Sequence, residues 1–376
     1  MAKTQEILVI GGGIIGLAIA VELQLRGARV TVLSRDFHQA ATQAAGGMLA
    51  PQAERLPLSP MLELGVRSRA LYSDWTGKLE QLSGLSTGYW PCGILAPSET
   101  AEPLPLPYSE AEGQEIGPAI WLDYDAIRQR QPGVGDSIQG GWWFPKDAQV
   151  DNRLLAKALL AAAIAIGVEV CEGVTVTQLE RQGDRIQAAL TTQGDRWQAD
   201  RYILATGAWV QELLPISVVP RKGQMLSLRV PIQQGCDGAT NDALPLRQVL
   251  FGHNLYLIPR QDGRIVIGAT SEDVDFTPHN TPEGIATLLT GAMHLYPPLR
   301  SFPIEELWWG FRPATADTFP ILGASPYENL VLATGHYRNG ILLAPITANL
   351  VADWILNQAA DPLLSHFRYD RAIASV

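Results

Sequence analysis

The chain has 376 residues, of which 47% are hydrophobic and 18% are charged, a composition typical of a packed globular protein and not of a disordered chain. At about 100–200 residues per domain, this length predicts two domains, or one large domain with an insert. Its 28 Lys and Arg against 38 Asp and Glu give a net charge of −10, whose field repels phosphate backbones, so we expect no nucleic-acid partner.

The first 33 residues have the pattern of a βαβ unit. Residues 7–10 are a short apolar run typical of a buried parallel strand, and apolar residues then recur at helical spacing over residues 14–26. Gly27 ends this predicted helix, and residues 29–33 form the second predicted parallel strand.

A glycine pattern for nucleotide binding lies between the first strand and the helix. Gly11, Gly13 and Gly16 have the spacing G-x-G-x-x-G. The first glycine permits the tight turn, the second permits close approach of a pyrophosphate, and the third lets the helix pack on the strand. Since the N–H groups of the helix start would face the anion, we predict a dinucleotide site.

The identity of the nucleotide is open at this point of the chain. An acidic residue is expected about 20 positions further on, where it would bind the ribose hydroxyls. The chain has Ser34, Arg35 and Asp36 there. Ser34 and Arg35 could accommodate the 2′-phosphate of NADP, whereas Ser34 could also hydrogen-bond a ribose, and Asp36 could reach it.

The middle of the chain predicts a second domain and a return to the first. A helix is expected over about residues 59–82, and residues 84–141, rich in Pro and Gly, are expected to be loops and short strands. Asp151 is a predicted N-cap of a helix that ends at Gly167. Strands are then predicted at residues 168–170, 174–179, 185–191 and 201–205. The last runs into Thr206 and Gly207, a second strand-to-glycine-to-helix turn, which indicates that a discontinuous domain completes its sheet.

The C-terminal half predicts a mostly antiparallel sheet and a third glycine turn. The predicted strands are residues 218–229, 255–260, 264–269, 305–312 and 330–334, and the predicted helices are residues 282–295 and 341–357. The fold class is therefore predicted as α/β with an α+β second domain, that is, a Rossmann-like domain with a discontinuous, mostly antiparallel partner.

Cysteine usage and hydropathy indicate the cellular compartment in which the protein is expected. Cys92, Cys171 and Cys236 are widely spaced, and none of the six histidines joins them in a metal-ligand spacing. We therefore expect no disulfide framework, no metal site and a reducing compartment. The N-terminus lacks a signal-peptide pattern, and residues 158–168, the most apolar later stretch, are about half a membrane span. We expect a cytoplasmic protein without a membrane partner.

Four separated motifs resemble those of the D-amino-acid-oxidase-like FAD-dependent oxidoreductases. They are the glycine turn at residues 11–16, the small residues 44–49, the turn at 206–209, and the paired segments 312–323 and 335–345. They occur in the family's order over nearly the whole chain, and the glycine oxidases of the thiamine pathway are the most similar branch. The resemblance implies an FAD-binding domain at residues 1–85, 146–215 and 312–376, and a substrate-binding domain at residues 86–145 and 216–311.

The same resemblance implies how FAD is bound. Because no cysteine follows Cys236 to link a flavin, we expect the FAD to be noncovalent. The backbone of residues 336–342, more than the side chain of His336, is expected to hold the pyrimidine end of the flavin. The residues expected to bind FAD are Gly11, Gly13, Ile14, Ile15, Gly16, Ser34, Arg35, Thr42, Gly46, Gly47, Met48, Val176, Gly207, His336, Tyr337, Arg338, Asn339, Gly340, Ile341 and Leu342.

The resemblance assigns the substrate carboxylate to Arg338, with Arg312 and Tyr256 close to it. A guanidinium can hold a carboxylate through two parallel hydrogen bonds and so orient it. Hydride transfer to the flavin depends on this orientation, so no acid–base residue is obligatory. Each residue also has a structural alternative: Arg338 as a surface arginine, Arg312 as a strand-end cap, and Tyr256 as a core tyrosine that shares a strand face with Asn254 and Ile258.

The expected activity is that of a glycine oxidase. The resemblance implies oxidative deamination of glycine, sarcosine and small D-amino acids by hydride transfer to flavin N5, with O₂ reduced to H₂O₂ and the imine giving glyoxylate and ammonia, or dehydroglycine for the thiazole of thiamine. It also makes a homotetramer and hand-off to a thiazole synthase plausible. Two alternatives stay open: a D-amino-acid or proline dehydrogenase that reduces a quinone, and a noncatalytic NADP-binding protein.

Overall fold

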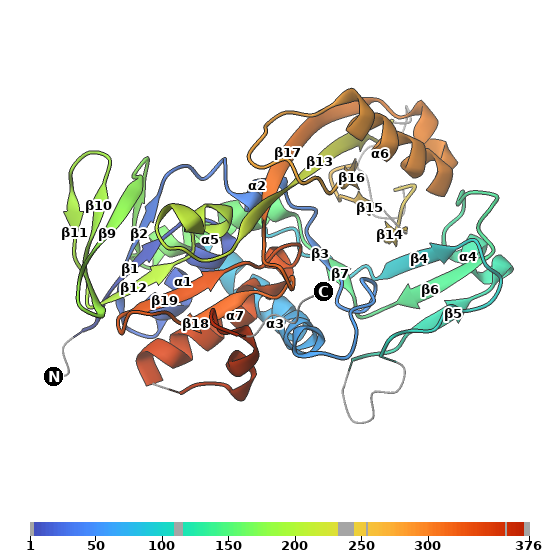
Figure 1. Ribbon diagram of the computed structural model, residues 1–376. Helices are drawn as coiled ribbons and strands as arrows, with labels where there is room; N and C mark the ends of the chain where they lie inside the picture. The colour runs from blue at the N-terminus through green and yellow to red at the C-terminus, as the bar shows by residue number, and fades with distance from the viewer. Residues whose placement is uncertain (1–3, 109–115, 232–243, 253–254, 358, 372–376) are drawn as a thin grey trace.

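The computed structural model describes residues 4–108, 116–231, 244–252, 255–357 and 359–371. Within these residues the strands form a six-stranded sheet, an eight-stranded sheet and two smaller ones. Figure 1 shows the six-stranded sheet with its helices on the left and the strands of the eight-stranded sheet on the right. The predicted fold class is confirmed.

The six-stranded sheet is built around the N-terminal βαβ unit, which confirms that prediction. All neighbouring strands in it are parallel except β18, which runs antiparallel to β19. Central parallel strands are buried on both faces, and residues 7–10 are all buried accordingly. In spatial order the strands are β18 (Ile321–Ala324), β19 (Leu330–Thr334), β12 (Arg201–Leu204), β1 (Glu6–Ile10), β2 (Arg29–Ser34) and β8 (Glu169–Glu172).

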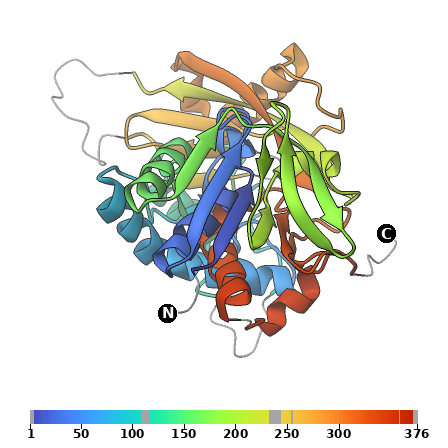
Figure 2. The same ribbon diagram turned by 90° about the vertical axis from the view of Figure 1, so that its left-hand side faces the viewer.

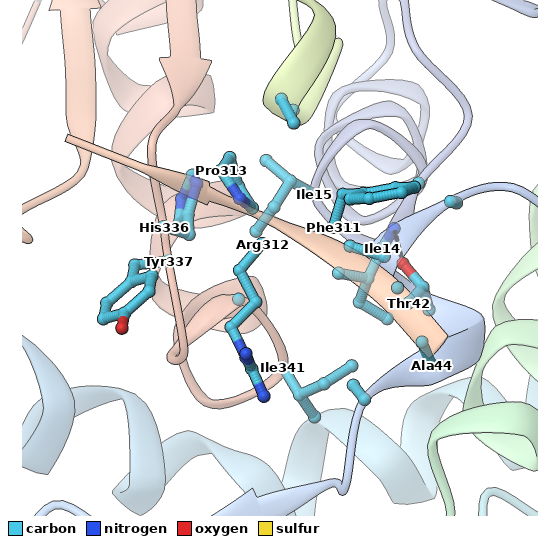
Figure 3. A pocket seen from close by; sticks show the side chains of 18 of the residues that line it. Ile14, Ile15, Thr42, Ala44, Phe311, Arg312, Pro313, His336, Tyr337 and Ile341 are labelled. Atoms are coloured by element: carbon cyan, nitrogen blue, oxygen red, sulfur yellow. Dashed lines mark hydrogen bonds between the residues drawn. The ribbon is translucent and has the colours of Figure 1, made fainter. Parts of the chain in front are cut away.

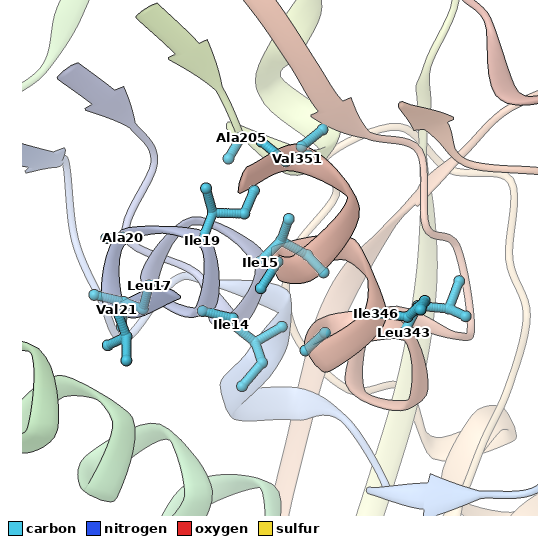
Figure 4. Packing of buried hydrophobic residues seen from close by; sticks show 14 of the residues in the cluster. Ile14, Ile15, Leu17, Ile19, Ala20, Val21, Ala205, Leu343, Ile346 and Val351 are labelled. Atoms are coloured by element: carbon cyan, nitrogen blue, oxygen red, sulfur yellow. The ribbon is translucent and has the colours of Figure 1, made fainter. Parts of the chain in front are cut away.

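Helices cover one face of this sheet. They are α1 (Ile14–Leu25), α3 (Pro60–Ser83), α5 (Asn152–Ala165) and α7 (Gly340–Ala352), and their apolar side chains share one core with β1 and β2. Figure 4 shows Ile14, Ile15 and Ile19 of α1 beside Leu343 and Ile346 of α7. Helix α5 begins as predicted, since the Asp151 carboxylate accepts hydrogen bonds from the first N–H groups of the helix.

The apolar helix α7 is a core element. By length and composition, Gly340–Asn357 could cross a membrane, but 67% of this segment is buried inside the protein. Its packing against α1 and α3 accounts for its apolarity. This segment, and not residues 158–168, is the apolar stretch that comes closest to a membrane span among the described helices.

The other face of the six-stranded sheet carries a small antiparallel sheet of β9 (Val176–Gln182), β10 (Arg185–Thr191) and β11 (Arg196–Trp197), seen in Figure 2. Leu179 and Ile186 pack against Leu8 and Tyr202 of the large sheet. The turn after β12 leads into a short 3-10 helix, η1 (Gly207–Glu212), where the glycine pattern predicted a helix.

The eight-stranded sheet is mostly antiparallel, as predicted, and α6 (Pro282–Leu295) packs on it. Only the pair β14–β4 is parallel among its described pairs. In spatial order its strands are β17 (Ile304–Ala314), β13 (Val219–Arg229), β16 (Arg264–Gly268), β15 (Tyr256–Pro259), β14 (Val249–Phe251), β4 (Ile94–Ser98), β6 (Gly140–Phe144) and β5 (Ile120–Leu122).

Shorter elements complete the described part of the chain, and the longest of those that the sequence analysis missed is a helix. Helix α4 (Tyr124–Arg130) lies in the region predicted as loops and strands, although Asp123 caps its N-terminus through the N–H of Ala126. The others are α2 (Ala41–Ala44), β3 (Met48–Leu49), β7 (Ala148–Gln149), the 3-10 helices η3 (Pro297–Ser301) and η5 (Pro362–Phe367), and the π-helical turn η4 (Asp353–Asn357).

The predicted division into two domains stays a proposal. All strands of the six-stranded sheet come from the segments assigned to FAD binding, and all strands of the eight-stranded sheet begin within the segments assigned to the substrate. Strand β17 extends past the proposed boundary at residue 312 and ends at Ala314.

Candidate functional site

One cavity of about 600 Å³ lies where the two large sheets meet. Its volume is typical of a cofactor or ligand site. The walls come from the N-terminal glycine turn, the ends of β2, β12 and β19, the α2–β3 segment, and strands β13, β15 and β17. Figure 3 shows Ile14, Thr42, Arg312, His336 and Ile341 around this space.

The first and third glycines of the turn have the structural roles that their spacing predicted. Gly11 has φ +115°, and a Cβ on it would lie 2.3 Å from the carbonyl oxygen of Ala205. A Cβ on Gly16 would lie 1.9 Å from the carbonyl oxygen of Gly11, so Gly16 permits helix packing and does not line the cavity. Thr42 Oγ1 accepts a hydrogen bond from the N–H of Ile14 at 2.9 Å, at the start of α1.

Three residues at the end of β2 line one end of the cavity, which we call the β2 end. The guanidinium of Arg35 pairs with the carboxylate of Glu212 from η1, a cavity residue that the sequence reasoning missed. Asp36 accepts hydrogen bonds from the N–H of His38 and from Gln39 Nε2. Ser34 is 3% exposed, and its hydroxyl lies without a hydrogen bond to any described residue.

The Arg35–Glu212 pair bears on which nucleotide fits. A 2′-phosphate needs a free basic group, but the charge of Arg35 is already neutralised. The β2 end therefore suits a ribose without a 2′-phosphate better than the phosphorylated ribose of NADP.

Two further features fit a dinucleotide cofactor. Thr206 Oγ1 borders the cavity and is buried without a hydrogen-bond partner in the part of the chain that the structure describes. A buried hydroxyl without a partner is costly, so it marks a place where a polar ligand group would bind.

Helix α7 supplies the second feature, since Asn339 makes no side-chain cap and Gly340 and Ile341 line the cavity. The unpaired N–H groups of this helix start would stabilise negative charge.

His336 is unsuited to proton transfer. Its imidazole is 2% exposed, and Nε2 lies 3.2 Å from the hydroxyl of Thr347 within α7. Burial lowers the pKa of His336 to about 3, because the charged ring would lose its hydration. The ring is therefore neutral at physiological pH.

Arg312, Tyr256 and Arg338 all line the cavity. Arg312 Nη1 donates to the carbonyl oxygens of Thr270 (3.1 Å) and Lys222 (3.4 Å), which fixes the guanidinium. A Cβ on Gly223 would lie 2.3 Å from Arg312 Nη2, so this glycine provides room for the arginine. In Figure 3 the guanidinium points into the open space beside Ile341.

Tyr256 stands beside this arginine in the core of its sheet. Its side chain is 8% exposed, its pKa is raised by burial, and the charge of Arg312 acts on it in the opposite sense. It shares a buried cluster with Ile258, as the predicted alternation requires, while Asn254 lies outside the described residues.

Arg338 has a carboxylate partner that sequence reasoning missed. Its Nη2 lies 3.9 Å from Glu54 Oε1, and the Arg338 side chain is 43% exposed while that of Glu54 is 13% exposed. Burial raises the pKa of Glu54, and the charges of Arg338 and Arg312 offset part of this rise. No spacing around Glu54 marks it in the sequence, because the contact joins distant segments.

Most predicted FAD-binding residues line the cavity, and three do not: Gly16, Asn339 and Leu342. Leu342 is buried, and its carbonyl accepts a hydrogen bond from Ser68. The N–H of Asn339 donates to the carbonyl of His336 within the turn. Lining residues that the sequence did not predict include Glu54, Trp209, Glu212, Met225, Phe251, Thr270 and Phe311.

Cys92 and Cys171 are free thiols, and Cys236 lies outside the described residues. Among the described residues, no group of three or more His, Cys, Asp or Glu side chains could hold a metal ion.

Comparisons with known proteins show which proteins this chain is similar to. The family model described as "FAD dependent oxidoreductase" matches residues 6–354. The "Bifunctional protein ThiO/ThiG" of Nostoc sp. is 58% identical over 98% of this chain, which covers 55% of that protein. This chain thus spans about half the length of the ThiO/ThiG relatives that it matches. "Glycine oxidase" of Bacillus licheniformis is 30% identical over 99% of this chain and 98% of that protein. The crystal structure of glycine oxidase from Geobacillus kaustophilus superposes with TM-score 0.88 at 31% identity, over 98% of this chain and all of that one.

Proposed function

The chain belongs to the family of FAD dependent oxidoreductases, and on that premise we propose that it is a glycine oxidase that deaminates glycine, sarcosine and small D-amino acids. One observation carries the proposal: Arg312 presents a fixed guanidinium beside Tyr256, at the same cavity that the start of α7 borders. Such a group binds and orients a small carboxylate. The relatives named glycine oxidase support the same activity.

The geometry favours Arg312 over Arg338 as the main carboxylate ligand. Two carbonyl oxygens hold Nη1 of Arg312, and its remaining N–H groups can meet a substrate. Arg338 is half exposed and is already paired with Glu54. We therefore assign the substrate carboxylate to Arg312 with Tyr256, and a secondary role to Arg338.

FAD is the cofactor of this family, and the cavity fits it. We propose that the glycine turn, Thr42 and the hydroxyl of Thr206 hold FAD without a covalent bond, and that Ser34 with Glu212 meets the adenosine ribose. When bound, FAD would supply the hydride acceptor for the substrate α-carbon and the route by which the electrons reach O₂.

The residues of the chain then have three tasks. Arg312 and Tyr256 fix the substrate so that its α-carbon faces the cofactor, which is the main requirement of hydride transfer. The N–H groups at the start of α7 stabilise negative charge at their end of the cavity. The neutral, buried His336 takes no part in proton transfer. The imine product hydrolyses to glyoxylate and ammonia, or leaves as dehydroglycine.

The wider setting is also a proposal. The name ThiO/ThiG belongs to proteins that are nearly twice as long as this chain and 52–58% identical to it, which supports a role in making the thiazole of thiamine, with hand-off to a thiazole synthase. We further propose a cytoplasmic homo-oligomer, with a tetramer as the plausible form.

One experiment tests the function. The purified protein is mixed with glycine without O₂, and its visible spectrum is followed before air is admitted and H₂O₂ is measured. We expect glycine to bleach the flavin and air to restore it with one H₂O₂ per glycine. Bleaching with little H₂O₂ would favour a quinone-linked dehydrogenase, and a protein that neither contains nor binds FAD would favour the NADP-binding alternative.

A further inference from the structure

We propose that Glu54 sets the charge selectivity of the substrate site: by neutralising Arg338 it leaves a single free guanidinium, so that the site prefers substrates with one anionic group over those with two. The inference rests on the proposed function, because it concerns the same site. It adds to that function a statement about selectivity: the wild-type site disfavours substrates with two anionic groups.

The charged groups around the cavity fall into two sets. Six charged side chains line it among the described residues, and Arg35, Asp36 and Glu212 belong to the β2 end. The substrate end has Arg312, Arg338 and Glu54, of which Arg338 and Glu54 lie 3.9 Å apart. The ammonium of Lys222, whose carbonyl oxygen accepts from Arg312, is 3.5 Å from the carboxylate of Glu272 and is likewise compensated. The substrate end therefore carries one net positive charge, and Arg312 is its guanidinium without a described carboxylate within salt-bridge distance.

The backbone that leads into Glu54 is held by a buried network, so this residue has a fixed position in the chain. The N–H of Ala53 donates to Asp147 Oδ2 at 2.8 Å. Gln52 Oε1 accepts from Arg69 Nη1 at 2.8 Å, and the same guanidinium pairs with the fully buried Asp147. Tyr108 donates its hydroxyl to the carbonyl of Gln52 at 3.1 Å. A loop anchored in this way presents Glu54 to the cavity as part of its wall.

The chemical consequence follows from charge complementarity. An amino acid with one carboxylate satisfies Arg312, and its small remainder faces a wall that carries no net charge. A second carboxylate or phosphonate on the substrate would meet Glu54, which repels it and competes for Arg338. Removing the charge of Glu54 would free the second guanidinium for a second anion.

The test compares sarcosine with iminodiacetate, two secondary amines that differ by one carboxylate. We expect Glu54→Gln to raise the ratio of kcat/KM for iminodiacetate to that for sarcosine at least tenfold, and Glu54→Asp to leave it near the wild-type value. Kd values of acetate and malonate, measured by the change that they cause in the flavin spectrum, should shift in the same direction without any turnover. Arg338→Gln should lower the ratio, because Glu54 then stands unpaired.

Glu180→Gln is the matched control, since it removes a carboxylate from an exposed pair with Arg196 on the small sheet and should leave the ratio unchanged. An unchanged ratio in Glu54→Gln, with FAD still bound, overturns the inference. If that variant does not fold, the ratio in Arg338→Gln decides, and a ratio that stays level or rises overturns the inference. Failure of the proposed function looks different, because the wild-type protein would then oxidise neither amine.

Discussion

Arg312 and Arg338 lie at the same end of the cavity, and their partners distinguish them. Carbonyl oxygens orient Arg312 and leave its charge free, whereas Glu54 neutralises Arg338. We expect Arg312→Ala to reduce kcat/KM for glycine more than a hundredfold, which corresponds to a loss of about 3 kcal/mol in transition-state stabilisation. Arg338→Ala should cost less than tenfold. Steady-state kinetics at saturating FAD measure both, and a larger loss in Arg338→Ala would return the main role to that residue.

The buried imidazole of His336 predicts a pH dependence of stability. Its folded-state pKa of about 3 lies below the ordinary value near 6.5, so only the unfolded chain takes up this proton between these values. The free energy of unfolding therefore falls as the pH drops below about 6.5. From pH 7.5 to pH 5 this contribution amounts to about 2 kcal/mol.

The variant His336→Asn isolates the effect. Urea denaturation at saturating FAD should show that the wild type loses about 2 kcal/mol more than the variant over this pH range. The raised pKa of Asp147, about 6, acts in the opposite direction but is common to both proteins and cancels in the difference. Parallel pH profiles for the two proteins would show that the ring is not buried in the neutral form.

The carboxylate of Asp151 joins the start of helix α5 to the end of β15 and the start of β16. Asp151 accepts the N–H groups of Arg153 and Leu154, and its Oδ2 lies 2.7 Å from Arg264 Nη2 and 3.6 Å from Arg260 Nε. Arg260 is 3% exposed, and it also donates to the carbonyl of Gly46 in the cavity wall. Asp151 thus caps a helix and balances a buried charge at once.

We expect Asp151→Ala to lower the free energy of unfolding by about 3–5 kcal/mol, because Arg260 would be left as an uncompensated buried cation. Asp123→Ala is the matched control, since Asp123 caps α4 at an exposed site and should cost only about 1 kcal/mol. Chemical denaturation of both variants gives the comparison. Equal losses would mean that capping alone accounts for Asp151.

The cavity joins the two large sheets. A Cβ on Gly310 of β17 would lie 2.4 Å from the Cβ of Ala44, so the long strand of one sheet contacts the glycine-rich segment beside the other. A cofactor that contacts both walls binds the folded state only, and therefore stabilises the entire chain.

Free FAD at a hundred times its Kd should raise the free energy of unfolding by about 2.7 kcal/mol. Calorimetry of the FAD-free protein with increasing FAD measures this as a rising Tm, and riboflavin, which lacks the adenosine end, should raise it less. Acid precipitation should release all the flavin into the supernatant. Flavin that stays with the pellet would contradict a noncovalent site.

The amino-acid sequence alone was enough to predict the features that have a recognisable local pattern. The βαβ start, the glycine turn and the capped start of α5 follow from the spacing of apolar residues, the freedom of Gly11 and the carboxylate of Asp151. The flavoprotein family followed from local motifs at Gly11, Gly207 and Arg312. These features could be predicted because each leaves a pattern that can be recognised within a short segment of the sequence.

The distribution of charges around the cavity could be seen only in the folded chain. Arg35 and Glu212 stand 177 positions apart in the chain, and Arg338 meets Glu54 across the cavity. Such pairs depend on which loops the sheets bring together, and neither residue carries a local pattern that reveals its partner. The preference that we propose for Arg312 over Arg338 rests on the same kind of contact, because Glu54 lies beside Arg338 and competes with a substrate for that guanidinium.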